Sequence, residues 1–235
     1  MKTLKQIFSE HEGKVVDKWA SYIHEYERLF APLRGEPVAL LEIGVQNGGS
    51  LEIWDKYFPW AEAIVGCDID QACKALQFKS GSIRVVIGDA STEESARQIT
   101  AITSDFEIII DDGSHTSKDI ISTFSRYFSA LKDGGLYIIE DLHCSYWSNY
   151  GGGLAHPYSA LSFLKVLTDI INNEHWGIAK QRREFLSRYS HYYGVQFDED
   201  VLASIHSITF LNSLCVIRKV AAITTKGRMH SAAVA

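Results

Sequence analysis

Two β-branched runs, each ending abruptly in a pair of acids, constrain this chain more than any other feature. These elements are Phe106–Ile110 with Asp111-Asp112, and Leu136–Ile139 with Glu140-Asp141. An amphipathic pattern over 117–132 separates the runs and predicts a strand–helix–strand unit. Parallel strands joined in this way end at the same edge of a sheet, where open α/β sheets bind ligands. Four carboxylates at one edge would repel one another unless a cation lies among them, so the sequence predicts a divalent-metal site.

Strands and helices alternate along the rest of the chain. Further strands are predicted at 38–45, 63–68, 83–87, 205–211 and 214–220, and helices over most of 1–31 and at 51–58, 72–78, 91–102 and 159–171. This alternation predicts a doubly wound, mostly parallel sheet, closed by an antiparallel C-terminal hairpin. The predicted organisation is an N-terminal helical extension (1–35), a main α/β domain (36–220) and a flexible tail (221–235).

Composition excludes several classes of function. A net charge of −6 leaves no electrostatic footprint for nucleic acid, and the one short basic cluster, Lys180 to Arg183, is typical of a solvated helix face. Four cysteines without a CxxC pair indicate reduced thiols. No apolar run reaches the length of a signal peptide core or a membrane span, so we expect a soluble, cytoplasmic protein without membrane insertion.

A glycine-rich loop follows the first predicted strand. Its sequence, EIGVQNGGS from Glu42 to Ser50, spaces the glycines as G-x-x-x-G-G rather than as G-x-G-x-x-G, so a plain strand–helix turn is an alternative. Asp68 stands at the end of the second strand, where a carboxylate can accept hydrogen bonds from both hydroxyls of a ribose. Asp89 follows the third strand and could accept one from an adenine amino group. Asp70 is either a second ribose ligand or a turn residue.

Over about 36–220 the chain resembles the class I S-adenosylmethionine-dependent methyltransferases. The resemblance rests on three motifs in order: E-x-G-x-x-x-G after the first strand, an acid at the end of the second strand, and G-D after the third. The resemblance implies a seven-stranded Rossmann-like sheet with a C-terminal antiparallel hairpin. It places Gly44 and Gly48 beneath the methionine and ribose of the cofactor, Asp68 at the ribose and Asp89 at the adenine. The remaining residues predicted for the cofactor site are Glu42, Ser50 and Asp111; Asp111 could alternatively cap a turn.

The stretches IIIDDGSH and LYIIEDLHCSYW resemble the metal-dependent sugar O-methyltransferases of macrolide and related natural-product pathways. That resemblance implies Mg²⁺ or another divalent cation bound by Asp112, Glu140 and Asp141, with His115 as the general base. Relatives of this kind often assemble, which allows for a homo-oligomer. A looser D-K…Y similarity in 16–30 assigns no role to Asp17 or Lys18.

The chemistry of methyl transfer to a hydroxyl independently requires a cation site and a base. An aliphatic hydroxyl is a poor nucleophile at neutral pH, and a cation held by carboxylates can orient it and lower its pKa. A histidine, with an ordinary pKa near ~6.5, can then remove the proton. On this hypothesis Asp112 and His115 are catalytic, and His143 either orients a ligand or is an ordinary polar loop residue.

An aromatic loop follows the second acid pair. Tyr146, Trp147 and Tyr150 could contact the C–H face of a sugar, and the glycines at 151–153 could let the loop move as a lid. Packing onto the sheet edge is an equal alternative for each aromatic side chain.

The leading prediction is an S-adenosylmethionine- and Mg²⁺-dependent O-methyltransferase acting on a sugar hydroxyl of a glycosylated natural product or glycan. Three alternatives stay open: methylation of a catechol-like phenol, a non-catalytic S-adenosylmethionine-binding module, and a nicotinamide-dependent oxidoreductase. The glycine spacing argues against the oxidoreductase.

Overall fold

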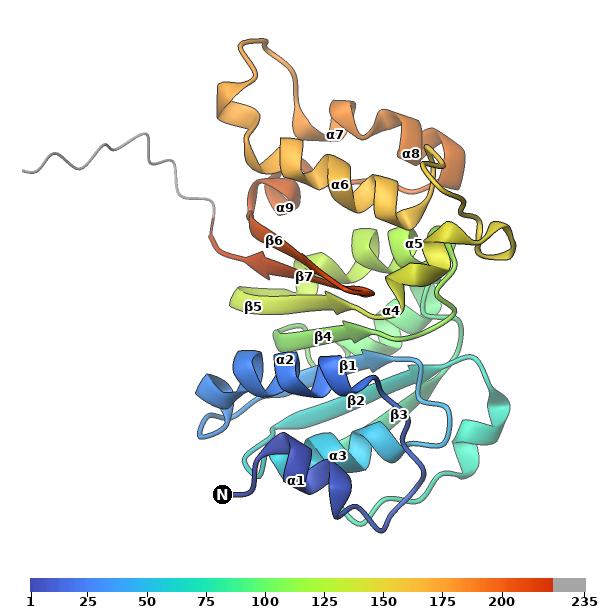
Figure 1. Ribbon diagram of the computed structural model, residues 1–235, viewed down its shortest axis with the longest axis vertical. Helices are drawn as coiled ribbons and strands as arrows, with labels where there is room; N and C mark the ends of the chain where they lie inside the picture. Colours follow the sequence, from blue (N-terminus) through green and yellow to red (C-terminus); the bar gives the residue numbers. More distant parts are fainter. Residues whose placement is uncertain (222–235) are drawn as a thin grey trace, which may run out of the picture.

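A single mixed sheet of seven strands, in the order β3-β2-β1-β4-β5-β7-β6, organises residues 1–221, which are the residues that the computed structural model describes (Figure 1). The strands are β1 (Ala39–Ile43), β2 (Ala63–Asp68), β3 (Ile83–Ile87), β4 (Phe106–Asp111), β5 (Leu131–Ile139), β6 (Ile205–Leu211) and β7 (Leu214–Lys219). β1 to β5 are parallel, and β7 pairs antiparallel with both β5 and β6. The predicted sheet with its closing hairpin is confirmed, whereas the predicted tail falls outside the described residues apart from Ala221.

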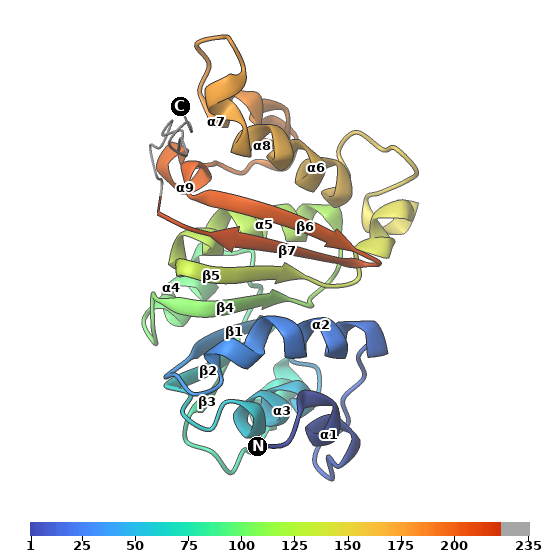
Figure 2. The ribbon, with the colours of Figure 1, turned by 60° about the vertical axis from the view of Figure 1, so that its left-hand side comes forward.

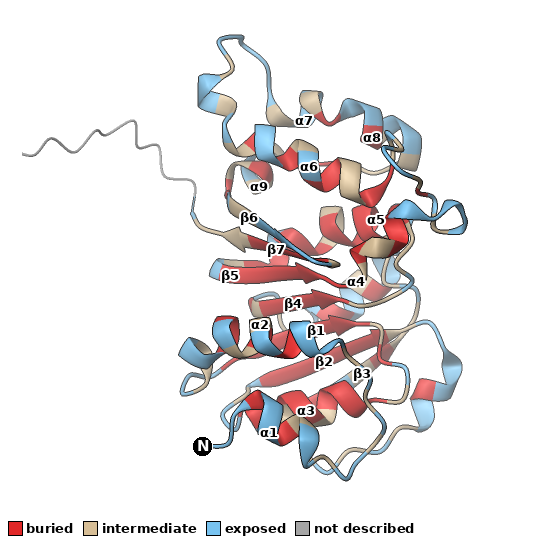
Figure 3. Ribbon diagram, in the orientation of Figure 1, coloured by how far each residue is buried: buried red, intermediate tan, exposed pale blue. Residues whose placement is uncertain are grey.

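Helices cover both faces of the sheet, because alternate strand residues are apolar on each side. One face carries α1 (Leu4–Ser9), α2 (Ala20–Phe30) and α3 (Gly49–Tyr57); the other carries α4 (Glu93–Thr100), α5 (Ser117–Tyr127) and α6 (Ala160–Ile171) (Figures 1 and 2). The short helices α7 (Arg182–Phe185), α8 (Ser187–Tyr193) and α9 (Glu199–Ala203) lie near α6. Figure 3 shows the central strands buried and the outer helix faces exposed.

The N-terminal region, predicted to be helical over most of 1–31, is interrupted in its middle. The chain is helical in α1 and α2, but residues 11–19 are not helical. This segment runs over the start of α3, where the backbone N–H of Lys14 donates to Glu52 Oε2 at 3.0 Å. Gly49 makes the approach feasible, since a Cβ there would lie 2.1 Å from the carbonyl oxygen of Val15. These tertiary contacts override the local helical pattern.

Two other predicted helix limits also shift. The helix predicted from Ser91 begins at Glu93, because the hydroxyl of Thr92 accepts from the backbone N–H of Ser95 and caps it. The helix predicted over 117–132 ends at Tyr127, because Leu131 already pairs with Phe106 in the sheet. Within residues 1–221, no helix has the length and apolarity needed to cross a membrane.

The N-terminal helices share a core with the sheet. Leu4, Tyr22 and Tyr26 belong to the same buried cluster as Leu40 of β1 and Ile138 of β5. Residues 1–35 therefore pack directly on the α/β core, and the division predicted at residue 35 stays a prediction.

Candidate active site

A cavity of about 580 Å³ lies along the carboxyl edge of β1 to β4. The loops after these strands form its walls, and residues 15–18 of the N-terminal segment cover part of it. The predicted site residues that line the cavity are Gly44, Ser50, Asp68, Asp89, Asp111, Asp112 and His115. One cavity therefore brings together residues predicted for the cofactor, the metal and the proton transfer.

The loop after β1 depends on glycine at two positions. Gly44 has φ +92°, and a Cβ there would lie 2.0 Å from the carbonyl oxygen of Asp112. Gly48 has φ +83° and precedes α3, packed against the ring of Phe78. A side chain at either position would be strained. Gly48 does not line the cavity, so its predicted place beneath the cofactor stays a prediction.

Glu42 lies beneath the loop rather than in the cavity wall. Its side chain is fully buried, and Oε2 accepts hydrogen bonds from Ser50 Oγ at 2.6 Å and Trp54 Nε1 at 3.2 Å. Oε1 has no hydrogen bond among the described residues and lies 3.4 Å from Lys18 Nζ. Glu42 does not line the cavity, and its predicted cofactor role stays a prediction.

The acids after β2 and β3 shape the cavity through backbone contacts. Asp68 Oδ2 accepts from the N–H groups of Val45 at 2.7 Å and Gln46 at 2.8 Å, which pins the glycine loop to the end of β2. Asp70 accepts from the N–H of Ala72 at 2.8 Å, as expected of a turn residue. Asp89 likewise accepts from the N–H of Ser91 at 2.8 Å. The ribose and adenine roles of Asp68 and Asp89 stay predictions.

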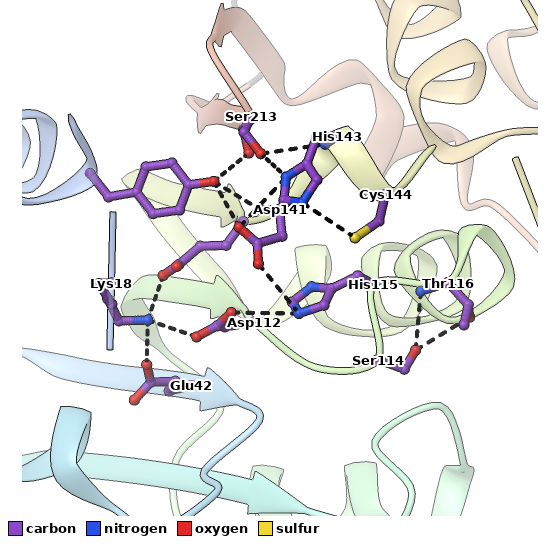
Figure 4. A network of polar contacts seen from close by, with 12 residues as sticks. Lys18, Glu42, Asp112, Ser114, His115, Thr116, Asp141, His143, Cys144 and Ser213 are labelled. Atoms are coloured by element: carbon purple, nitrogen blue, oxygen red, sulfur yellow. Dashed lines mark hydrogen bonds and ion pairs between the residues drawn. The ribbon is translucent and has the colours of Figure 1, made fainter. Parts of the chain in front are cut away.

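Asp112, His115 and Asp141 form a cluster at the ends of β4 and β5. Each offers a ligand atom within 4.8 Å of the others, and His115 Nε2 lies 3.9 Å from Asp112 Oδ1 and 3.8 Å from Asp141 Oδ2 (Figure 4). His115 and Asp141 have φ of +56° and +51°, a conformation that costs roughly 1–2 kcal/mol per residue. Two carboxylates around an open space suit a hard divalent cation, so the donor set fits Mg²⁺.

Lys18 occupies the centre of the acidic group. Its Nζ donates to Asp112 Oδ2 and to Glu140 Oε1, both at 2.7 Å, and its side chain is only 2% exposed (Figure 4). Burial opposes the charged ammonium, but Glu140, Asp112 and Glu42 together hold the pKa of Lys18 well above its usual value. Lys18 is therefore a buried cation that partly neutralises the acids.

Glu140 is more deeply placed than the other two predicted metal ligands. It is 2% exposed, and its Oε1 accepts from both Lys18 Nζ and Tyr26 Oη, the latter at 2.5 Å. Burial raises the pKa of Glu140, and Lys18 opposes that shift. The structure thus groups Asp112 and Asp141 with His115, whereas Glu140 is buried against Lys18 and Tyr26. The metal role of all three acids stays a prediction.

Asp111 lines the cavity from a buried position. Its Oδ2 accepts a short hydrogen bond from Thr123 Oγ1 and lies 3.5 Å from Tyr137 Oη. Burial raises the pKa of Asp111 to about 6. Both alternatives named for Asp111 stay open, because it lines the cavity and is also bonded within the fold.

His143 and the aromatic loop border the acidic cluster outside the cavity. His143 Nδ1 lies 2.5 Å from Ser213 Oγ and 3.9 Å from Asp141 Oδ1. Its ring lies between Trp147, at a centroid distance of 5.0 Å, and Trp19, at 6.1 Å. The three aromatic residues predicted for the substrate lie here: Tyr146 and Trp147 are about half exposed, and Tyr150 packs on Trp147. Their substrate role stays a prediction.

Sequence comparison relates the chain to sugar O-methyltransferases. It is 36% identical over 163 residues to the 8-demethyl-8-alpha-L-rhamnosyl tetracenomycin-C 2'-O-methyltransferase of Streptomyces olivaceus, which covers 65% of this chain and 42% of that protein. It is 35% identical over 160 residues to the mycinamicin VI 2''-O-methyltransferase of Micromonospora griseorubida, covering 63% and 39%. No model of a known protein family matches the chain.

Structural comparison agrees with the sequences. The MycE methyltransferase of the mycinamycin pathway, solved in complex with Mg, SAH and mycinamycin VI, superposes with a TM-score of 0.76 and 26% identity. The match covers 95% of this chain and 55% of MycE. In sequence and in fold, the chain is thus similar to S-adenosylmethionine-dependent sugar O-methyltransferases of macrolide and polyketide biosynthesis. It spans less than half the length of the curated relatives it matches.

Sequence reasoning missed three residues of this candidate site. Lys18, Tyr22 and Tyr26 all contact the acids, yet the tyrosines were interpreted only as apolar positions of a helix, and Lys18 received no role. The available signal was a lysine followed by tyrosines at steps of four residues, within the loosely similar segment 16–30. Periodicity predicts which side chains are buried, but it does not show that their polar atoms reach the acids.

Proposed function

We propose that this chain is the catalytic part of an S-adenosylmethionine- and Mg²⁺-dependent O-methyltransferase that methylates a sugar hydroxyl of a glycosylated natural product. The observation that carries the proposal is that His115 and Asp112 line the same cavity as Gly44 and Asp68, and that Asp141 completes their cluster. A methyl donor in that cavity would lie next to the only group of three or more potential metal-ligating side chains found within residues 1–221.

The residues divide the chemistry as follows. The donor, when bound, supplies a methyl group on a sulfonium, and Mg²⁺, when bound, orients the acceptor hydroxyl and lowers its pKa. Asp112 and Asp141 would hold the cation together with the more deeply buried Glu140. His115 Nε2 faces the space between Asp112 Oδ1 and Asp141 Oδ2, so it would take the hydroxyl proton there. Alignment of the hydroxyl with the methyl group would supply much of the acceleration.

The acceptor is inferred from the relatives and from the aromatic side chains beside the acidic cluster. The matched proteins are named for methylation of rhamnosyl tetracenomycin and mycinamicin. Beside the acidic cluster of this chain, Trp19 and Trp147 are each about half exposed and flank His143. Exposed aromatic faces next to a cation site suit a sugar ring, whose C–H face is apolar and whose vicinal hydroxyls bind metals.

The proposal is tested with the purified chain, S-adenosylmethionine, Mg²⁺ and a rhamnosylated polyketide, with methylation followed by mass spectrometry. We expect a singly methylated product that disappears on addition of EDTA, while binding of S-adenosylhomocysteine survives chelation. Methyl transfer that continues without divalent metal would contradict the metal assignment. A catechol assayed in parallel, if strongly preferred, would contradict the sugar assignment.

The base assignment is tested by His115→Ala. Loss of a positioned general base typically slows a reaction by about 10²–10⁴-fold, and the steepest loss is expected below the pH at which the hydroxyl ionises by itself. The control is His175→Ala, because the His175 side chain is 70% exposed and outside the site. Wild-type turnover of a sugar acceptor by His115→Ala would refute the assignment.

A further inference from the structure

Three side chains at steps of four residues, Lys18, Tyr22 and Tyr26, face the acidic cluster and are here called the N-terminal stripe. Tyr22 and Tyr26 lie one turn apart on α2, whereas Lys18 precedes the helix, whose N-cap is Trp19. All three are buried: Tyr22 is 1% and Tyr26 is 0% exposed, and the Lys18 side chain is 2% exposed. The polar ends of the stripe therefore have no free access to solvent and are directed at the acids.

Each acid predicted for the metal is bound by the stripe through one oxygen. Lys18 Nζ donates to Asp112 Oδ2 at 2.7 Å, and Tyr22 Oη lies 2.9 Å from Asp141 Oδ1. Glu140 Oε1 accepts from Tyr26 Oη at 2.5 Å and from Lys18 Nζ at 2.7 Å. No hydrogen bond or ion pair within residues 1–221 joins the stripe to the second oxygen of any of these acids.

The second oxygens of two of these acids face the open part of the cluster. Asp112 Oδ1 and Asp141 Oδ2 are the atoms that lie 3.9 Å and 3.8 Å from His115 Nε2. A carboxylate held through one oxygen cannot rotate freely, so the other oxygen keeps its direction. Tyr22 is itself fixed, because its hydroxyl also lies 2.9 Å from the carbonyl oxygen of Ser213 and accepts from the N–H of Asp141 at 3.2 Å.

The stripe also sets the charge of the site. Lys18 supplies one positive charge among Glu42, Asp112 and Glu140, and Asp141 lies beyond its reach. The tyrosines add hydrogen-bond donors without adding charge. The cluster keeps an excess of negative charge, which a divalent cation can balance.

We propose that Lys18, Tyr22 and Tyr26 are positioning residues of the metal site. They bind one oxygen of Asp112, Asp141 and Glu140 and leave the other oxygen of Asp112 and of Asp141 for the divalent cation. This inference rests on the proposed function, because it assumes that these acids bind metal. It goes beyond that function by assigning the N-terminal segment a part in metal affinity.

Tyr22→Phe tests the inference, since it removes one hydroxyl and leaves the ring in place. Partners that orient metal ligands typically contribute 10- to 100-fold to affinity, so we expect Mn²⁺ to bind 10- to 100-fold more weakly, as measured by electron paramagnetic resonance. Tyr26→Phe should weaken Mn²⁺ binding in the same direction. The matched control is Tyr57→Phe, a buried tyrosine of α3 whose hydroxyl donates to Glu27 at 3.2 Å. The control should change Mn²⁺ affinity less than about twofold.

Two further measurements separate positioning from general damage. Affinity for S-adenosylhomocysteine should stay at the wild-type value in Tyr22→Phe, which also shows that the variant is folded. In turnover assays the Mg²⁺ concentration for half-maximal rate should rise, while kcat at saturating Mg²⁺ should stay near that of the wild type.

The outcomes are distinct. If Tyr22→Phe and Tyr26→Phe bind Mn²⁺ as tightly as Tyr57→Phe does, the positioning role is overturned and the proposed function stands. If the wild-type protein binds no Mn²⁺, the metal part of the proposed function fails, and this inference fails with it. Weakened Mn²⁺ binding with intact S-adenosylhomocysteine binding supports both.

Discussion

The two halves of the candidate site are built by different means. In the half predicted for the cofactor, backbone groups do most of the positioning: Asp68 binds two N–H groups of the loop after β1, and Gly44 permits close approach of the chain after β4. In the acidic half, side chains position one another. Lys18 reaches Asp112 across 94 positions of sequence and Glu140 across 122.

This difference indicates which substitutions each half of the site tolerates. A half built on backbone contacts depends on a few residue types, such as glycine in the left-handed region, and those types are visible in a sequence. A half built on buried side-chain charges depends on every partner being present, because an uncompensated charge is costly inside a protein. We therefore expect the two halves to fail differently when single residues are changed.

The largest expected effect is on stability, from Lys18→Met. This change leaves Glu42, Asp112 and Glu140 without their cation, and breaking a buried pair typically costs about 3–5 kcal/mol of unfolding free energy. Urea denaturation of the metal-free protein measures the loss.

Lys2→Met is the control for that experiment. Lys2 pairs with Glu10 at the surface, where its side chain is 63% exposed, and exposed pairs are worth at most about 1 kcal/mol. Equal stability losses for the two variants would show that Lys18 does not neutralise the acids.

A smaller effect, confined to the cofactor half, is expected from Asp68→Ala. It releases the N–H groups of Val45 and Gln46 and removes the predicted ribose partner. Two lost charge-assisted hydrogen bonds should weaken S-adenosylhomocysteine binding by about 10- to 100-fold, while Mn²⁺ affinity stays within about twofold. Calorimetric titration of each ligand checks both values.

Asp70→Ala sharpens the same comparison. Asp70 lines the cavity, but its Oδ1 caps a turn through Ala72. We expect a modest loss of stability, about 0.5–2 kcal/mol, with little change in S-adenosylhomocysteine affinity. A larger affinity loss for Asp70→Ala than for Asp68→Ala would transfer the ribose role to Asp70.

The smallest effect concerns a buried thiol behind the cofactor half. Burial, and then the nearby carboxylates Asp68 and Asp89, raise the pKa of Cys67 to about 12. The thiolate is the reactive form, so the native thiol should stay protonated and unreactive toward iodoacetamide at pH 8 and should react once unfolded. Mass spectrometry of labelled peptides measures the extent of labelling of Cys67 in the native and unfolded protein. Rapid native labelling of Cys67 would show that this part of the sheet edge opens easily.

Sequence alone predicted the architecture, which is confirmed, and the sheet edge at which the candidate site residues meet. The β-branched runs, the acids at their ends and the glycine loop all have local signatures, and each was found where a parallel sheet brings strand ends together. His115 was likewise identified by its offset from Asp112, and the two lie at one cluster. The chemical roles of these residues stay predictions, because the type and position of a side chain do not by themselves show what it does.

Only the tertiary structure decided how the acids are held. The pattern over 1–31 predicted mainly helix, and contacts of residues 11–19 with the start of α3 interrupt it. Tyr22 and Tyr26 looked apolar by periodicity, although their hydroxyls bind Asp141 and Glu140. Periodicity reports which side of a helix is buried, whereas a buried ion pair forms between residues that only the fold brings together. For that physical reason Lys18, the cation at the centre of the acids, became recognisable only in three dimensions.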